Sequence, residues 1–214
     1  MHLKLNTLSI GTIALTLIAA NAHPQTVGAY YNGGGILTTN GNSLGWWFEV
    51  TDPVTLTHLG LYDHGAPGLA ESHEVGIFLH SNPGTALGVV TVPSGTSAML
   101  VEGTRFVELS TPLSLQTGVA YYMLANNWQT DQLVVEGLSG NAISYNGFVI
   151  QRGTCGEGNN NIFNPNIQIT EGGELLGPNF MIEGVPEPSS VVGLAMAAGV
   201  FALARRRRRQ RSRS

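Results

Sequence analysis

The sequence predicts an all-β fold, an antiparallel β-sandwich, for the part of the chain between residues 23 and 184. Segments rich in β-branched and aromatic residues recur there at a spacing of roughly ten residues, with turn signals between them, as is typical of sandwiches. The whole chain has 28 glycines and only 11% charged residues, a composition that suits short strands joined by Gly-rich turns. Because no helical period interrupts this pattern, we expect one all-β domain.

Residues 1–22 have the parts of a secretory signal peptide, which forms a signal helix ahead of the domain. Lys4 precedes an apolar run from Leu8 to Ala20, and Ala20-Asn21-Ala22 is a small-x-small cleavage site. The run is shorter than a membrane-spanning helix requires, which favours cleavage over the alternative of an uncleaved anchor. We expect the mature chain to start near His23 and its domain to cover residues 23–184.

The first strands are predicted before residue 51. Val27–Tyr31 favours a short strand, and Asn32–Asn42 favours a loop because it is rich in Gly and Asn. Trp46–Val50 is aromatic and therefore favours a strand. Successive side chains of a strand point to opposite faces, so we expect one of Trp46 and Trp47 in the core and the other exposed or under a loop.

The later strands follow from apolar runs that turn signals separate. We expect them at Val54–Tyr62, His73–Leu79, Leu87–Val92, Arg105–Leu109, Leu113–Leu115, Val119–Ala125, Leu133–Val135 and Asn179–Glu183. We expect loops at Asp63–Ser72 and, with high mobility, at Thr154–Asn166. Two sheets of four or five strands can form. The predicted core residues are Val75, Ile77, Leu79, Val90, Val92, Phe106 and either Tyr121 or Tyr122.

The predicted domain is strongly acidic, although the whole chain carries a formal charge of only −4. Residues 23–184 contain two bases, Arg105 and Arg152, and thirteen acidic residues, which leaves a formal charge of −11. Such a surface repels nucleic acid, so we expect no nucleic-acid partner. Cys155 is the only cysteine, which excludes an internal disulfide and makes Cys155 a bystander in this interpretation.

The densest group of polar residues is Asp63, His64, Glu71, His73 and Glu74. Oxygen ligands in a loop at the edge of a sandwich suit Ca²⁺, and the candidate ligands are the carboxylates of Asp63, Glu71 and Glu74. The two histidines would instead suit a transition metal. A third interpretation is purely structural, with these side chains capping a strand and filling a loop. We expect no other cofactor.

Sequence motifs of enzymes are missing. The chain has no Gly-x-Ser-x-Gly elbow and no phosphate-binding Gly-x-x-x-x-Gly-Lys loop. Its many glutamates offer carboxylate pairs for glycoside cleavage, but the sequence does not select one pair. We therefore expect a protein that is not an enzyme.

Aromatic residues offer another kind of binding site, because sugars stack on exposed rings. The candidate stacking residues are Trp46, Trp47 and Trp128, and we expect Trp128 to be the most exposed because it follows Asn126-Asn127 at the end of a strand. The alternative is that these rings belong to the core, as strand-borne aromatics commonly do.

The end of the chain has three consecutive parts. Val185, Pro186, Glu187 and Pro188 come first, an apolar helix is expected at 189–204, and the run Arg205, Arg206, Arg207, Arg208 and Arg209 precedes a short tail at 210–214. The uncharged residues 191–204 would form a helix of roughly 21 Å, which the flanking residues extend to a short transmembrane helix. Arginines remain cytoplasmic, so the domain should lie on the other side of the membrane.

These three parts, in this order, resemble the PEP-CTERM sorting signal of Gram-negative bacteria. The resemblance implies that exosortase is a partner, that processing occurs at residues 185–188, and that the arginine run sets the membrane topology. His58–Ala125 and Gly177-Pro-Asn-Phe180 further resemble a module of PEP-CTERM proteins, which implies a jelly-roll-like sandwich and no activity.

The resemblance also implies a location. We expect an exported protein that passes through an intermediate anchored in the inner membrane and ends at the cell surface or in the extracellular matrix. The leading hypothesis is a non-enzymatic structural or adhesive role. The alternative is a carbohydrate-binding module whose partner is the exopolysaccharide of the biofilm.

Overall fold

The computed structural model describes residues 25–31, 35–38, 42–135, 143–164, 166–173 and 175–183. The predicted signal peptide at 1–22, the processing residues 185–188, the predicted helix at 189–204 and the arginine run 205–209 lie outside the described residues. Within the described part, no helix has the length and apolar character to cross a membrane.

The described residues form sixteen strands. They are β1 (Thr26–Val27), β2 (Ala29–Tyr31), β3 (Gly35–Thr38), β4 (Ser43–Val50), β5 (Val54–Tyr62), β6 (His73–Leu79), β7 (Ala86–Val92), β8 (Met99–Val101), β9 (Thr104–Leu115), β10 (Tyr121–Ala125), β11 (Gln132–Val135), β12 (Ile143–Tyr145), β13 (Val149–Glu157), β14 (Gln168–Glu171), β15 (Leu175–Leu176) and β16 (Pro178–Ile182). The named strands pair antiparallel throughout the described residues, which confirms the predicted all-β class.

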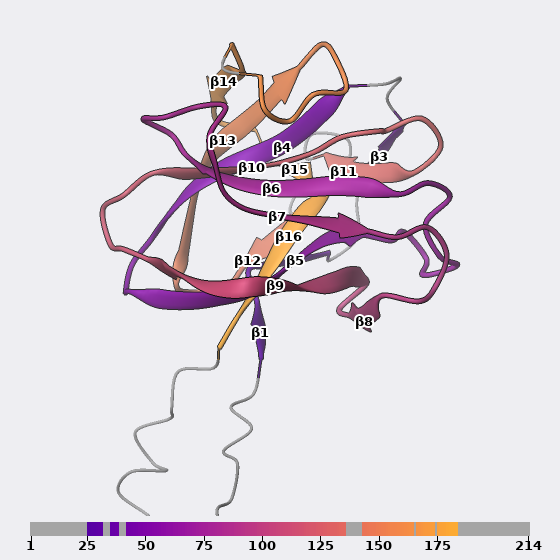
Figure 1. Cartoon of the computed structure of the whole chain (residues 1–214), viewed down its shortest axis with the longest axis horizontal. Coiled ribbons are helices and arrows are strands. Elements are labelled where there is room, and N and C mark those ends of the chain that lie inside the picture. Colours follow the sequence, from indigo (N-terminus) through magenta and orange to yellow (C-terminus); the bar gives the residue numbers. More distant parts are fainter. Residues whose placement is uncertain are drawn as a thin grey trace, which may run out of the picture.

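Two large sheets make up the sandwich (Figure 1). One has five strands in the order β1-β16-β5-β9-β8, and the other has six in the order β14-β13-β4-β10-β6-β7. Two smaller sheets, β15-β11-β3 and β12-β2, complete the described part. The two large sheets contact one another through aromatic rings, since Trp46 and Phe48 of β4 lie 6.0 and 5.0 Å from Phe180 of β16 between ring centroids.

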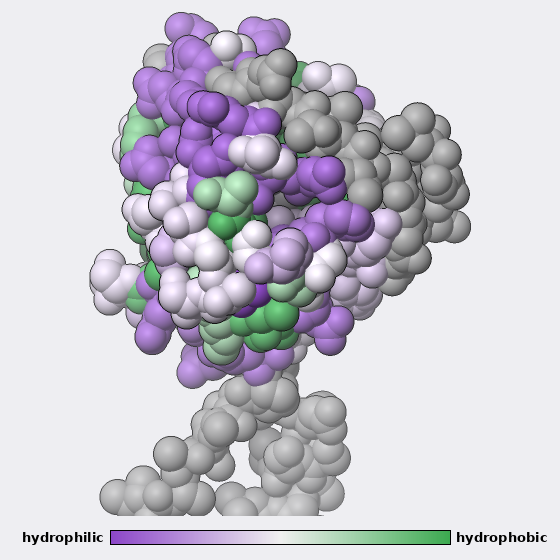
Figure 2. Space-filling model, turned by 90° about the vertical axis from the view of Figure 1, so that its right-hand side faces the viewer, coloured by the Kyte–Doolittle hydropathy of each residue, from purple (hydrophilic) through white to green (hydrophobic). Residues whose placement is uncertain are grey.

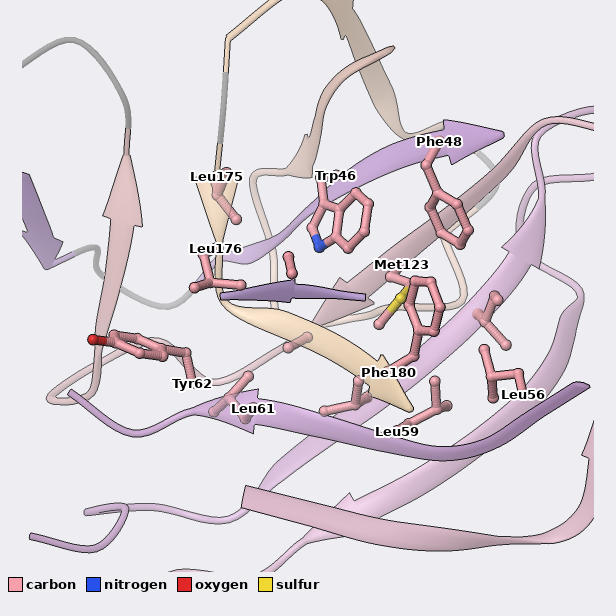
Figure 3. Close-up of a cluster of buried hydrophobic side chains, with 14 of the residues drawn as sticks. Trp46, Phe48, Leu56, Leu59, Leu61, Tyr62, Met123, Leu175, Leu176 and Phe180 are labelled. Atoms are coloured by element: carbon pink, nitrogen blue, oxygen red, sulfur yellow. The ribbon is translucent and has the colours of Figure 1, made fainter. Parts of the chain in front are cut away.

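The core between the sheets is continuous and apolar. Leu56, Leu59 and Leu61 of β5 point toward Trp46 and Phe48 of the opposite sheet (Figure 3). The predicted core residues Val75, Ile77, Val90, Val92, Phe106, Tyr121 and Tyr122 are buried, whereas Leu79 is only partly buried. The alternation of side chains at β4 is confirmed as well: Trp46 is in the core, and Trp47 faces the other side of the sheet.

A second apolar layer covers the outer face of the six-stranded sheet. Phe78 and Tyr122 stack with their centroids 4.9 Å apart, and Ile162 buries its side chain against them. The prediction of a mobile loop at Thr154–Asn166 was therefore wrong in part, because its first residues end β13 and Ile162 is fully buried. Cys155 belongs to this layer, and burial raises the pKa of its thiol.

The glycines in and next to this segment suggested a loop, but in the structure they lie where neighbouring strands approach closely. A side chain on Gly153 would lie 1.9 Å from the carbonyl oxygen of Thr170, and one on Gly156 would lie 2.8 Å from Leu44. Glycine inside a strand often marks such a close approach of another backbone. The strands that we did not predict are β13 itself, β3, inside the expected loop at Asn32–Asn42, and β8, β12, β14 and β15.

The segment Gly177-Pro-Asn-Phe180 joins the beginning and the end of the domain. The side-chain amide of Asn179 is fully buried; it accepts from the N–H of Ala29 at 3.2 Å and donates to the carbonyl of Ala29 at 2.7 Å. A side chain on Gly177 would lie 2.6 Å from the ring of Trp128. The segment thus fixes β2 beside β16 and makes room for a buried tryptophan.

The two ends of the described domain lie side by side (Figure 1). Thr26 pairs with Ile182 and Val27 with Met181, and the N–H of Glu183 donates to the carbonyl of Thr55 at 2.8 Å. The strand that leads to the end of the chain is therefore held between β1 and β5 up to its last described residue.

Candidate functional site

The candidate site lies where β6 begins. Glu71, His73 and Asp131 each offer one ligand atom, and these atoms all lie within 4.8 Å of one another. His73 is the first residue of β6, Glu71 belongs to the preceding loop, and Asp131 comes just before β11. The structure thus brings Glu71 together with a histidine from the predicted polar group and with an aspartate that the sequence did not indicate.

His73 is completely buried between two acceptors. Its Nδ1 lies 2.6 Å from the carbonyl oxygen of Asn126, and its Nε2 lies 2.9 Å from Oδ2 of Asp131. A carbonyl oxygen and a carboxylate can only accept hydrogen bonds. Each ring nitrogen thus lies within hydrogen-bonding distance of a protein oxygen, so both are engaged inside the domain.

Asp131 binds backbone amides as well as His73. Its carboxylate accepts from the N–H of Ala70 at 2.9 Å and from the N–H of Glu71 at 3.0 Å. Burial alone would raise the pKa of Asp131, but the hydrogen bonds from His73, Ala70 and Glu71 outweigh it and lower this pKa to about 2. The carboxylate is therefore ionised and joins the segment before β11 to residues 70–73.

Glu71 differs from Asp131 in having one free oxygen. The hydroxyl of Thr130 donates to its Oε1, whereas Oε2 is buried and has no hydrogen-bond partner among the described residues. The side chain as a whole is only partly buried. Glu71 is the single member of the cluster that could still bind a proton donor or a cation.

Asp63 does not belong to this cluster, so the predicted ligand set Asp63, Glu71 and Glu74 is corrected. Asp63 is buried and accepts from Nε of Arg105 at 2.8 Å and from the N–H of Gly68 at 3.0 Å. Arg105, also buried, donates further to the carbonyl oxygens of Thr96, Ala98 and Ala66. This ion pair joins the loop after β5 to the connection between β7 and β8, and the described residues supply partners for both of its charged groups.

Glu74 lies on the opposite face of β6 from His73, as the alternation of a strand requires. Its carboxylate accepts from Nδ2 of Asn126 at 3.1 Å, and its N–H donates to Oδ1 of the same side chain at 2.8 Å. The three predicted ligands thus face three different environments: an arginine, the His73 cluster and an asparagine at the surface.

The prediction that Trp46 and Trp128 could stack on sugar was wrong. Both side chains are fully buried, and their ring N–H groups donate to the carbonyl oxygens of Pro178 at 2.7 Å and Ala125 at 2.8 Å. Trp128 turns inward because Asn127 has a positive φ of 64° and because Gly177 leaves space for its ring. Its ring also lies 5.5 Å from that of His73.

Trp47 remains the one candidate tryptophan with a partly exposed ring. Its N–H donates to the carbonyl of Thr170 at 3.2 Å, and its ring lies 5.1 Å from that of His80. Phe163, 41% exposed, contacts the neighbouring ring of Phe78. These side chains belong to the outer face of the six-stranded sheet and lie outside the His73 cluster.

Comparison with known protein families gives a match at the C-terminal end of the chain. Residues 184–209 match the family model of the PEP-CTERM protein-sorting motif. The chain carries a PEP-CTERM sorting motif. No curated protein matches the chain. The predicted resemblance of the C-terminal segment is thereby confirmed, and the fold of the domain agrees with the sandwich expected for it.

The PEP-CTERM motif is the recognition signal of exosortase. The chain is therefore an exported protein that depends on exosortase and is processed in association with the membrane. The motif begins at residue 184, directly after Glu183, whose N–H still belongs to the hydrogen-bond pattern of the domain. The folded domain and the PEP-CTERM motif are thus immediate neighbours in the chain.

Proposed function

We propose that the domain is a non-enzymatic structural or adhesive element of the cell surface or extracellular matrix, to which the PEP-CTERM motif delivers it. A jelly-roll-like path of the strands is part of this proposal. The observation that supports the structural role is that polar groups inside the domain are paired with one another or with the backbone. Asp63, Arg105, His73 and Asp131 hold one another or the backbone in place.

Such groups act as clamps between loops. A catalytic acid or base must reach the proton that it transfers in a bound substrate. In contrast, the carboxylate of Asp131 is already surrounded by His73 and two amides, and the guanidinium of Arg105 by one carboxylate and three carbonyls. This use of polar groups supports a structural role for the end of the sandwich that bears them.

The carbohydrate-binding alternative has lost two of its three candidate tryptophans, because Trp46 and Trp128 are in the core. It now depends on Trp47, which is partly buried and lies next to His80. Sugar stacking requires an accessible ring face, so replacement of Trp47 by alanine separates the two hypotheses.

The test uses a host that contains exosortase and lacks the gene for this chain. We expect wild-type protein to appear in the matrix fraction and to restore cell aggregation. The variant Trp47→Ala should do the same, and a Pro186→Ala/Pro188→Ala variant should fail because the sorting motif is damaged. Intact-mass measurement should show a wild-type species that begins near residue 23, ends within residues 185–190 and lacks the arginine run.

Two outcomes would contradict the proposal. If Glu71→Gln reaches the surface in normal amounts and melts normally but no longer restores aggregation, the free carboxylate has a chemical role. If only Trp47→Ala fails, and the wild type alone binds the host exopolysaccharide in affinity electrophoresis, the domain is a carbohydrate-binding module.

A further inference from the structure

One side of this acidic domain carries no charge. No Asp, Glu, Lys or Arg occurs in residues 75–101 or in residues 109–130, although residues 23–184 carry a formal charge of −11. The surface parts of these stretches, His80–Val101 and Leu109–Gly118, are called the neutral side below. They comprise β7, β8, the second half of β9 and the connections between them.

These strands meet at one edge of the sandwich. β7 ends the six-stranded sheet and β8 ends the five-stranded sheet. β9 joins them, because it pairs with β8 and packs beside β7, where a side chain on Gly88 would lie 3.0 Å from Leu109 and Leu113. β1 and β16, which hold the ends of the domain, lie at the opposite edge of the five-stranded sheet. In the five-stranded sheet, the neutral side and the paired ends of the domain therefore lie at opposite edges.

Exposed apolar side chains are concentrated on the neutral side. Of six large exposed apolar residues in the described part of the chain, four are Leu87 (38%), Val89 (36%), Met99 (43%) and Leu100 (43%). Leu87 and Val89 point outward because Val90 and Val92 of the same strand face the core. Figure 2 shows an apolar patch on this side of the molecule, at the level of β8, with hydrophilic residues around it.

Acidic residues surround this surface without entering it. Glu74 is the cross-strand neighbour of Thr91, Glu102 forms the turn between β8 and β9, and Glu108 comes just before the neutral half of β9. Edge strands of soluble proteins commonly carry a charge or a proline that prevents association. β7, with the sequence Ala-Leu-Gly-Val-Val-Thr-Val, has neither.

We infer that the neutral side is a surface through which two copies of this chain associate. The choice of a second copy as the partner rests on the acidic charge of the domain. Contact between two copies through other faces places acidic residues against acidic residues, and juxtaposed like charges cost several kcal/mol. The neutral side lets two copies bury apolar surface without this repulsion. An apolar centre with a polar rim is also the usual composition of an interface. The inference concerns the folded domain and does not depend on the proposed function.

Self-association through this surface is weak for a free domain, since only four large apolar side chains are exposed on its described residues. Many copies held at one surface would still adhere, because linked weak contacts reinforce one another. We therefore expect a concentration-dependent monomer–dimer equilibrium rather than a permanent dimer.

The test uses the processed protein recovered from the extracellular fraction of a host with exosortase. Sedimentation velocity over a range of concentrations should show reversible dimerisation of the wild type. Leu87→Glu and Val89→Glu each place a like charge in the contact and should weaken dimerisation at least about tenfold. Ile150→Glu is the matched control: Ile150 is a residue of β13 with 37% exposure, but it pairs with Glu49 of β4, away from the neutral side. This control should dimerise as the wild type does.

Melting curves of all variants show whether they remain folded, and Met99→Glu gives a third variant at the other edge strand. A wild type that stays monomeric at every concentration would overturn the inference. So would dimerisation that Val89→Glu and Met99→Glu leave unchanged, or dimerisation that a calcium chelator abolishes, because bridged carboxylates would then form the contact. A monomer that instead retains a different protein through Val89 would assign the surface to that partner.

Discussion

Asp63 is a buried carboxylate and Asp131 a partly buried one, and both lie in loops that contact residues 63–73, but they are stabilised differently. Asp63 faces the guanidinium of Arg105, whose charge does not vary with pH, whereas Asp131 faces His73 and two backbone amides. Both side chains of the Asp63–Arg105 pair are buried, and the side chain of Asp131 is slightly more exposed than that of Asp63. The comparison shows two ways in which this fold stabilises a carboxylate in a loop: with a guanidinium, or with an imidazole and backbone amides.

The largest expected effect is the loss of the Arg105 side chain. Replacing it with methionine leaves the carboxylate of Asp63 buried without its partner, and breaking a buried ion pair costs about 3–5 kcal/mol. Urea unfolding should show this loss in the free energy of unfolding. Arg152→Met is the matched control, because Arg152 pairs with Glu49 at the surface with 42% exposure, where an ion pair contributes about 0–1 kcal/mol. Equal losses in both variants would contradict the assignment of Arg105 as a clamp.

Asp131→Asn should have the second largest effect, at about 2 kcal/mol, because the hydrogen bonds to an ionised acceptor are weakened. The pH dependence identifies its cause. The pKa of Asp131 is lowered to about 2 in the folded protein, so its contribution is complete above the unfolded value near 4 and disappears as the pH falls toward 2. The difference between wild type and variant should therefore shrink between about pH 4 and pH 2. A difference that is constant over this range would exclude the carboxylate charge as its source.

The pairing of Asp131 with His73 also shows what sequence patterns do not contain. The fold class was predictable because strand periodicity and turn residues are local signals, and the opposite faces of Trp46 and Trp47 follow from alternation alone. His73 and Asp131 are 58 residues apart, and only the pairing of β6 with β10 brings Asn126 and the following loop to His73. Trp128 was misplaced for a similar reason, since the space for its ring comes from Gly177, which is distant in the sequence.

The addition of Ca²⁺ should have little effect on the stability of the domain. This experiment tests whether the predicted ligands form a metal site. Asp63, Glu71 and Glu74 have separate partners among the described residues, which is unfavourable for an ion that takes 6–8 shared oxygen ligands. We expect the melting temperature to stay unchanged when Ca²⁺ is added to chelated protein. A rise in melting temperature that Glu71→Gln abolishes would instead assign a site to the free Oε2 of Glu71, since a ligand of the native state stabilises it.

Among the substitutions, the smallest expected effect comes from the turn that supports Asp63. The N–H of Asp63 donates to the carbonyl of Gly103 at 2.8 Å, and the preceding Glu102 has a positive φ of 47°. Glutamate adopts this region reluctantly, whereas glycine adopts it without steric cost. Glu102→Gly should therefore stabilise the domain by about 0.5–1 kcal/mol through relief of strain. Near Asp131 the corresponding positive φ belongs to Asn127, whose side chain donates to the carbonyl of Ser72 at 3.0 Å. Asn127→Gly should lose this hydrogen bond and be neutral or destabilising. If thermal unfolding showed both replacements stabilising to the same extent, the two loops would not differ in the way that their hydrogen bonds indicate.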